Sequence, residues 1–314
     1  MKIIFMGTPQ FGAQILEELL QGPHDVIAVV TQPDRPKGRK RILTPSPVKE
    51  LALAHDIPVY QPEKISGSPE AKALIDLESD LIVTAAYGQF VPTDVLNAPK
   101  KYAINVHASL LPKYRGGAPI HYAIWKGESE TGISIIEMVK KMDAGDIFKQ
   151  GSISIEKTDD VGILFEKLAV LGRQVLRDTL EDIEAGREQR YAQDPDLVTF
   201  SPNIAKEEEQ IQWQQTAQEV DCHIRGFRPF PSTYTIHDGQ RLKIWAGYPL
   251  EQPLHSGQSV GTVVDSRPDG LVVQCGQGSG FVITQWQESG KKAMNLTDVF
   301  NGSPAESFVG HRYE

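Results

Sequence analysis

The sequence predicts an α/β chain, with a mainly parallel sheet in a first domain and a mostly β second domain. Three observations support this prediction. Short apolar runs alternate with helical patterns as far as residue 186, which is typical of βαβ units. Residues 187–207 lack periodicity and carry charge and proline, as linkers do. The remainder contains short alternating segments punctuated by Asp-Gly and Gly, which indicate hairpins.

The elements of the first domain follow in order from the apolar pattern. Short continuous apolar runs predict buried strands, and apolar residues at helical spacing predict helices. The predicted strands are 2–7, 25–32, 57–62, 80–88, 102–108, 131–138 and 151–157. The predicted helices are 10–22, 45–56, 69–79, 94–100 and 161–186. In such a sheet, ligands bind outside the carboxyl ends of the strands, so the loops there form the candidate rim.

The domain boundaries follow from the change of pattern. We expect a first domain at residues 1–187, a linker at 188–207 and a small β-barrel domain at 208–314.

The composition excludes several classes of protein. Net charge is −9, and both residues 1–200 and 201–314 are acidic overall, so no general positive field would attract DNA. Cys222 and Cys275 have neither metal-site spacing nor the number that a disulfide framework needs. No apolar stretch approaches the ~18 residues that span a bilayer, and "MKIIFMG" predicts a strand rather than a signal peptide. We therefore expect a cytoplasmic protein without a membrane partner.

The common phosphate and metal motifs are absent. "GTPQFG" has the outer spacing of a P-loop, but Ala13 and Gln14 stand where Lys and Ser or Thr belong. A tight strand-to-helix turn is the favoured interpretation. The eight histidines are scattered, without an HExxH pattern or a His/Cys cluster, so no metal site is predicted.

Polar residues at the end of strand 102–108 are the best candidates for chemistry. Asn105 and His107 are two residues apart, so they face the same side of the strand. The amide can donate to a developing oxyanion, and the imidazole can transfer a proton near neutral pH. Asp143 or Asp146 could orient the imidazole, and Gly145 would let the backbone approach a ligand closely. The pair equally fits a hydrogen-bonded cap, and spacing alone does not choose between these interpretations.

A basic segment, residues 32–47, follows the second strand and rises from the same rim. Five of its residues are cationic: Arg35, Lys37, Arg39, Lys40 and Arg41. Most charge runs are solvated surface loops. In an otherwise acidic chain, a basic loop beside a cleft also suits a polyanion such as an RNA backbone. Its charge, proline and glycine predict a mobile loop.

At these residues the sequence resembles the folate-dependent formyltransferase family. "NVHASLLPKYRGGAPI" followed by "MDAGDI" is similar to the family signature. "FMGTPQFG", "TQPDRPKGR", "PSPVK" and "QWQQTAQEVDCHIRGFRPFPSTY" narrow the resemblance to members that act on methionyl-tRNA. The match runs in order through both domains, and the whole set is highly specific.

The resemblance implies a Rossmann-like catalytic domain and an OB-like C-terminal barrel that helps to bind tRNA. It implies formyl transfer from 10-formyltetrahydrofolate, a cosubstrate, to the amino group of methionine on initiator tRNA. No metal is required, and we expect a monomer. From chemistry alone, the same site could formylate a small amine or hydrolyse 10-formyltetrahydrofolate, and an RNA-binding module without catalysis is a third possibility.

The resemblance also assigns residues. The catalytic Asn, His and Asp fall on Asn105, His107 and Asp143, which resolves the choice of aspartate. The folate-binding segment falls on Ser109, Leu110, Leu111 and Pro112, with the pterin near Phe90 and Val91. The tRNA-contacting loop falls on residues 32–47, and its important arginine on Arg39. Because the C-terminal part is acidic, tRNA binding there would need a local patch, for which the candidates are Arg225, Arg228, Lys243, Lys291 and Lys292.

Overall fold

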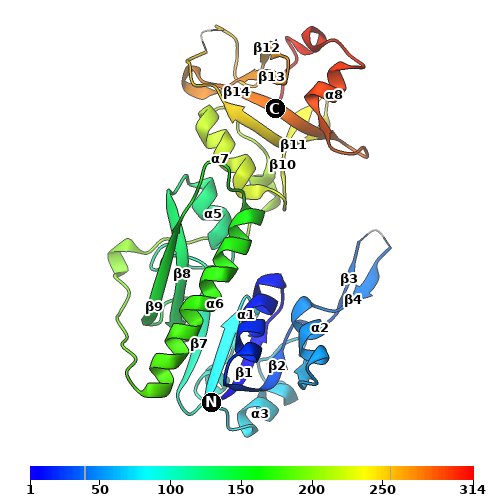
Figure 1. The fold of residues 1–314 in the computed structure, drawn as a ribbon. Helices are drawn as coiled ribbons and strands as arrows, with labels where there is room; N and C mark the ends of the chain where they lie inside the picture. The colour runs from blue at the N-terminus through cyan, green and yellow to red at the C-terminus, as the bar shows by residue number, and fades with distance from the viewer. Residues whose placement is uncertain (39, 255) are drawn as a thin grey trace. The chain divides into compact units, whose positions relative to one another are not determined.

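The computed structural model describes residues 1–38, 40–254 and 256–314, and the side chain of residue 37 lies outside that description. The chain forms two compact units (Figure 1). Unit 1 comprises Met1–Pro119, Thr131–Ile153 and Phe165–Ser201, and unit 2 comprises Ile120–Glu130, Ser154–Leu164 and Pro202–Glu314. Both units are discontinuous in sequence, and the boundaries predicted above stay a prediction.

Unit 1 is built on a seven-stranded sheet, which confirms the predicted mainly parallel arrangement. Its strands, in spatial order, are β5 (Val59–Tyr60), β2 (Asp25–Val30), β1 (Lys2–Gly7), β6 (Leu81–Ala85), β7 (Tyr102–His107), β8 (Glu130–Glu137) and β9 (Ile147–Ser154). The first five run parallel, and β8 is antiparallel to β7. The carboxyl ends of β1, β2, β6 and β7 therefore meet at one rim.

Helices cover both faces of this sheet because its central strands are apolar on both sides. α1 (Gln10–Gln21) and α6 (Val161–Ala185) lie on one face, where Gly172 of α6 approaches Ile15, Val106 and Ile133. α2 (Pro47–Ala54), α3 (Pro69–Asp76) and α4 (Thr93–Leu96) complete the unit. Ser46 caps α2 and Ser68 caps α3 through side-chain oxygens, each followed by proline at the first helical position.

The basic segment contains more structure than the sequence predicted. β3 (Arg35–Lys37) and β4 (Ile42–Thr44) pair as an antiparallel hairpin that extends from unit 1 (Figure 1). The segment predicted as a loop therefore contains two paired strands, and its mobility stays a prediction. Arg41 has φ +49°, a turn conformation between the strands.

Unit 2 contains the antiparallel sheet that the Asp-Gly and Gly signals predicted. Its strands are β10 (Thr233–His237), β11 (Gln240–Pro249), β12 (Val263–Arg267), β13 (Gly270–Gln274), β14 (Gly280–Glu288) and β15 (Met294–Asn295). Asp238 and Gly239 both have positive φ between β10 and β11, as a two-residue hairpin turn requires. The core gathers around Trp213, Phe281 and Trp286.

Several shorter elements complete the chain. They are α5 (Pro119–Trp125), α7 (Ala217–Phe227), α8 (Leu296–Phe300) and the 3-10 turns Pro195–Leu197, Lys206–Glu209, Gly276–Gly278 and Ala305–Phe308. The sequence patterns above did not predict α7, although Thr216 and Glu219 form a capping box at its start. No helix in the described part of the chain is both long and apolar enough to cross a membrane.

Candidate active site

Asn105 lies at the carboxyl end of β7, opposite Thr84 on β6. The Thr84 hydroxyl donates a hydrogen bond to Asn105 Oδ1 at 2.7 Å. Because that bond occupies the carbonyl side of the amide, it directs the NH₂ group the other way. Asn105 is half-buried, so its amide remains within reach of a ligand. Thr84 was missed, although one threonine within the apolar run "LIVTAA" was a detectable signal.

His107 is 5% exposed, and both of its ring nitrogens have neighbours that set its chemistry. Nε2 lies 2.9 Å from the carbonyl oxygen of Tyr114. A carbonyl only accepts, so Nε2 carries a proton in that bond. Nδ1 lies 3.7 Å from Asp143 Oδ2. Nδ1 is therefore the ring nitrogen that can exchange a proton with a substrate.

The structure brings Asp143, of the two candidate aspartates, to the imidazole. Its Oδ2 also accepts the backbone N–H of Gly116 at 2.8 Å. Asp146 instead presents its backbone carbonyl to the N–H of Glu137. A Cβ at Gly145 would lie 1.9 Å from the Glu137 carbonyl oxygen. Its missing side chain permits this close backbone packing, and its expected closeness to a ligand stays a prediction.

The predicted folate segment divides into inward-facing and accessible residues. Ser109 is fully buried, and its hydroxyl donates to the Lys113 carbonyl at 2.7 Å. Leu111 is 3% exposed, whereas Leu110 and Pro112 are half-buried. Ser109 and Leu111 therefore shape the turn, and the other two residues are available for contact.

The loop carrying Phe90 and Val91 leaves β6 beside β7, on the same rim as Asn105. Phe90 is 70% exposed and Val91 is 9% exposed. Gln89 anchors the loop by donating to the Pro62 carbonyl at 3.1 Å and accepting the Ile65 N–H at 2.9 Å. An exposed aromatic ring on an anchored loop suits a flat heterocyclic ligand.

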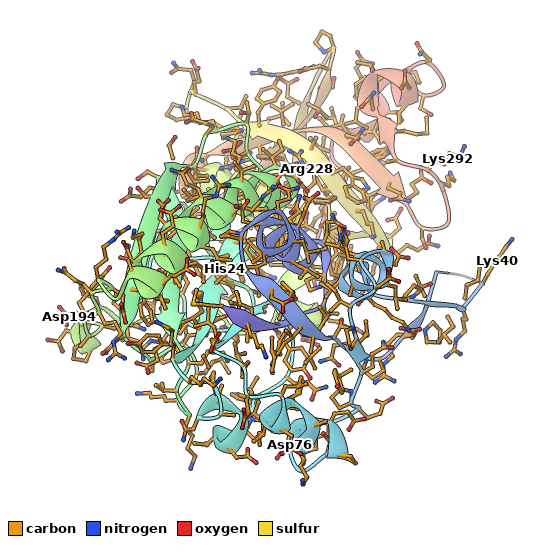
Figure 2. All side chains as sticks on the ribbon, turned by 60° about the horizontal axis from the view of Figure 1, so that its bottom comes forward. His24, Lys40, Asp76, Asp194, Arg228 and Lys292 are labelled. Atoms are coloured by element: carbon orange, nitrogen blue, oxygen red, sulfur yellow. The ribbon has the colours of Figure 1, made fainter. Side chains whose placement is uncertain are left out.

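The basic hairpin presents its charge toward solvent. Lys40 and Arg41 are exposed, and Figure 2 shows the Lys40 side chain at the far end of the hairpin. Arg35 pairs with Glu63, both of them more than half exposed. Arg39, to which the resemblance assigns the important tRNA contact, lies outside the described residues, as does the side chain of Lys37.

The predicted C-terminal basic patch is only partly available. Arg225 pairs with Asp221 and Arg228 with Asp160, each at 2.7 Å, and the arginine side chains are 11% and 28% exposed. These charges stabilise unit 2 internally. Lys243 and Lys292 are exposed, and Lys291 pairs with Glu288.

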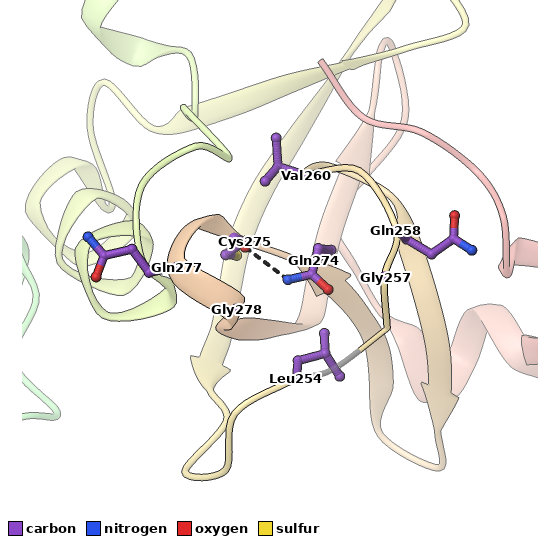
Figure 3. A pocket seen from close by; sticks show the side chains of 8 residues that line it. All are labelled: Leu254, Gly257, Gln258, Val260, Gln274, Cys275, Gln277 and Gly278. Carbon is purple, nitrogen blue, oxygen red and sulfur yellow. Dashed lines mark hydrogen bonds between the residues drawn. The ribbon is translucent and has the colours of Figure 1, made fainter.

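A cavity of about 440 Å³ lies in unit 2, and none of the described residues that line it is a predicted site residue. Figure 3 shows Gln274 beside it, donating to the Cys275 carbonyl at 2.9 Å. Burial raises the pKa of Cys275 to about 12, so the thiol is unreactive near neutral pH.

Cys222 and Cys275 are both free and buried. Within the described residues, no group of His, Cys, Asp and Glu could hold a metal ion.

Solved structures of similar fold include proteins that bind folates. The N-formyltransferase from Helicobacter canadensis, in complex with folinic acid and dTDP-3-aminofucose, has a TM-score of 0.68 at 16% identity, covering 90% of this chain and 98% of that one. HypX from Aquifex aeolicus, in complex with tetrahydrofolic acid, has a TM-score of 0.62 at 17% identity, covering 95% and 46%. At these identities the comparison establishes the fold.

Sequence comparison is more specific. The methionyl-tRNA formyltransferase of Enterococcus faecalis is 53% identical over 301 residues, which is 96% of each chain. That of Lactiplantibacillus plantarum is 52% identical over 311 residues, covering 99% of this chain and 98% of that one. A family model described as "Formyl transferase" matches residues 1–180, and its "Formyl transferase, C-terminal domain" counterpart matches residues 203–304. The chain therefore belongs to the formyl transferase family.

Proposed function

We propose that this chain transfers the formyl group of 10-formyltetrahydrofolate to the α-amino group of methionine on initiator Met-tRNA. The product would be the N-formylmethionyl-tRNA used in translation initiation. The observation that carries this proposal is sequence identity: about half of the aligned residues are identical to those of methionyl-tRNA formyltransferases, and the alignment spans both units. The rim that groups Asn105, His107 and Asp143 supplies the chemistry.

The amide of Asn105 has the role of oxyanion donor. As the methionine amine adds to the formyl carbon, negative charge develops on the formyl oxygen. The Asn105 NH₂ group, oriented by Thr84, stabilises that charge, and such preorganised donors act strongly where water is excluded. The protonated imidazole of His107 adds a second donor through Nδ1, since Nε2 is committed to Tyr114.

Asp143 has the role of proton acceptor and partner to the imidazole. Its carboxylate lies 3.7 Å from His107 Nδ1 and so orients the ring. The proton released by the attacking amine passes through Asp143, directly or by one water, to the departing nitrogen of tetrahydrofolate. The C–N bond to methionine forms in the addition step, and the C–N bond to tetrahydrofolate breaks when the oxyanion collapses, so charge and protons balance.

The accessible residues of unit 1 fit a folate donor. Its fused ring would pack on the exposed Phe90 side chain, with Leu110 and Pro112 bordering the formyl group. Phe90 follows the carboxyl end of β6, and Leu110 and Pro112 follow the carboxyl end of β7, the strand that carries Asn105. The bound folate supplies an electrophilic formyl carbon, and the residues above hold it against the amine.

The basic hairpin would contact the tRNA backbone. Lys40 and Arg41 are exposed cations on an otherwise acidic chain, and phosphate contacts of this kind supply affinity without base recognition.

We further propose that the protein acts as a monomer in the cytoplasm, without DNA or membrane partners. Equilibrium sedimentation with and without tRNA checks the oligomeric state.

The decisive assay follows labelled formyl groups from 10-formyltetrahydrofolate to different acceptors. Initiator Met-tRNA is expected to be the preferred acceptor over elongator Met-tRNA, small amines such as amino sugar nucleotides, and water. Preferential transfer to a small amine or to water would contradict the proposal.

The role of Asn105 is tested by Asn105→Ala. Loss of one oxyanion donor is expected to lower kcat by ~10²–10³ while folate affinity changes little. Single-turnover kinetics and folate binding by fluorescence separate the two effects. Wild-type turnover in this variant would refute the assignment.

A further inference from the structure

Residues 191–201, which we call the clasp, follow α6 and lie within unit 1. Their side chains are mostly exposed, but Gln193 is half-buried and Ser201 is fully buried. The clasp is held at both ends by bridges, Tyr191 to Ile147 and Phe200 to Arg115. A mostly exposed segment whose inward-facing residues include Gln193 and Ser201 can make specific contacts through them.

Gln193 sends its side-chain amide to the Asp143 turn. Its Nε2 donates to the backbone carbonyls of Asp143 and Gly145, both at 2.8 Å. Its Oε1 accepts two hydrogen bonds from the Arg115 guanidinium, at 3.0 Å from Nε and 2.7 Å from Nη2. Arg115 is 5% exposed, so this bonding is sheltered from water. All donors and acceptors of the Gln193 amide are thereby used.

The Asp143 backbone needs such support. Its φ is +50°, in the left-handed region that a residue with a Cβ rarely adopts. Strained backbone of this kind persists only where surrounding contacts determine it. Gln193 holds the carbonyls on either side of Ala144, and the Gly116 N–H holds the carboxylate itself. Together they aim the carboxylate at His107.

The other end of the clasp reaches the partner of His107. The Ser201 hydroxyl donates to the Tyr114 carbonyl at 3.0 Å, the same oxygen that accepts from His107 Nε2. Thr199 Oγ1 accepts the Tyr114 N–H at 2.9 Å. The clasp therefore contacts the supports of both His107 and Asp143.

We propose that the clasp is a positioning element for catalysis, with Gln193 as a positioning residue that holds Asp143 in its productive backbone conformation. The inference rests on the catalytic role proposed above for Asp143. It adds a function to residues whose sequence indicated only a linker, and it places no new group in contact with the substrate.

Gln193→Glu is the most discriminating variant. The carboxylate keeps an acceptor for Arg115, so the buried cation stays paired, but it cannot donate to the two carbonyls. A misplaced catalytic group costs up to about 10²-fold in rate. We therefore expect kcat to fall by about 10- to 100-fold, with KM for both substrates within about twofold of wild type.

A double-mutant cycle with Asp143→Asn separates positioning from general stabilisation. If Gln193 acts through Asp143, Gln193→Glu lowers kcat by less than about twofold in the Asp143→Asn background. Gln14→Leu is the matched control, because Gln14 donates one hydrogen bond to Glu166 on the surface of unit 1, and it should retain wild-type kcat.

Two outcomes overturn the inference: wild-type kcat in Gln193→Glu, or an equal loss in both backgrounds. If Gln193→Glu also lowers the thermal midpoint, Gln193→Asn is tested as a second variant. A Gln193→Asn protein with wild-type stability and wild-type kcat would also overturn the positioning role of Gln193. Wild-type turnover in Asp143→Asn alone would instead overturn the proposed catalytic site, so the two failures are distinguishable.

Discussion

The basic hairpin and the clasp are both largely exposed segments of unit 1, yet they use their polar side chains in opposite ways. The hairpin exposes Lys40 and Arg41 at its tip and the apolar Ile42 and Leu43 beside them, at 62% and 64%. The clasp, by contrast, turns its key amide inward to backbone carbonyls and a buried guanidinium. The hairpin is available to a partner, whereas the clasp is already occupied by its own unit.

This difference teaches that the charge and polarity of a segment do not reveal whether its side chains contact the same unit or another molecule. Exposed cations gain little from intramolecular pairs such as Arg35–Glu63, since solvent screens them. We expect them to contribute more to binding of a polyanion, as proposed for tRNA. Sheltered hydrogen bonds such as those of Gln193 are worth more to the fold, because breaking one leaves a buried group unsatisfied. Substitutions in the two segments should therefore change different kinetic constants.

Among substitutions in these two segments, the largest effect on the use of Met-tRNA is expected from the double variant Lys40→Ala/Arg41→Ala. Removing two phosphate contacts should lower kcat/KM for Met-tRNA by roughly 10²-fold and reduce the magnitude of the salt slope by about 2. At saturating tRNA, kcat should stay near wild type because the site is untouched. Steady-state kinetics at several salt concentrations measure both quantities.

Lys72→Ala/Lys100→Ala is the matched control for the hairpin variant. Both lysines are exposed, and Lys100 precedes the amino end of β7, at the rim opposite Asn105. An equal loss of kcat/KM in this control would show that general charge, rather than the hairpin, attracts tRNA.

A smaller effect is expected in the clasp from Ser201→Ala. The Tyr114 carbonyl would lose one of its donors, and with it part of the orientation of His107. We expect kcat to fall by about tenfold, with KM for Met-tRNA unchanged. Ser154→Ala, which removes an exposed hydroxyl bonded to Glu156, is the control. A raised KM with wild-type kcat would place Ser201 in substrate binding and remove the contrast with the hairpin.

Local patterns predicted the elements that carry the site, and the reasons are physical. The buried strands of unit 1 are continuous apolar runs, and the two-residue period of β7 places Asn105 and His107 on one side. The Asp-Gly turn at residue 238 follows from the positive φ that a tight hairpin needs. These features depend on neighbours in sequence, so one segment at a time is enough to find them.

The contacts that arrange the site join distant segments, and no local pattern predicts them. Gln193 meets the Asp143 carbonyl across 50 positions, and Thr84 meets Asn105 across 21. An isolated glutamine in a polar segment carries no periodic signal. From the residues alone, Asp143 and Asp146 were equal candidates, and only the chain's path brings one of them to His107.

The smallest effect concerns the chain beyond the clasp, where it is anchored in unit 2. The Glu208 carbonyl accepts from His223 Nε2 at 2.7 Å. Burial lowers the pKa of His223 to about 4, with the hydrogen bond to Glu208 opposing the shift. Its Nδ1 is buried without a partner in the described structure, so the charged ring would hold an unsatisfied N–H. Between the lowered pKa and the ordinary value near 6.5, the unfolded chain binds more protons than the folded one. Stability therefore falls as the pH is lowered through this window.

Urea unfolding of unit 2 in the full-length protein, at pH 6.5 and pH 5.5, measures this anchor. The loss from His223 over that interval is expected to be about 1 kcal/mol. His223→Gln keeps an N–H donor for Glu208 and removes the titration, so it should flatten the pH dependence by that amount. The exposed His55, replaced in the same way, should leave it unchanged. If His223→Gln retains the full wild-type slope, another group titrates and the assignment to His223 is wrong.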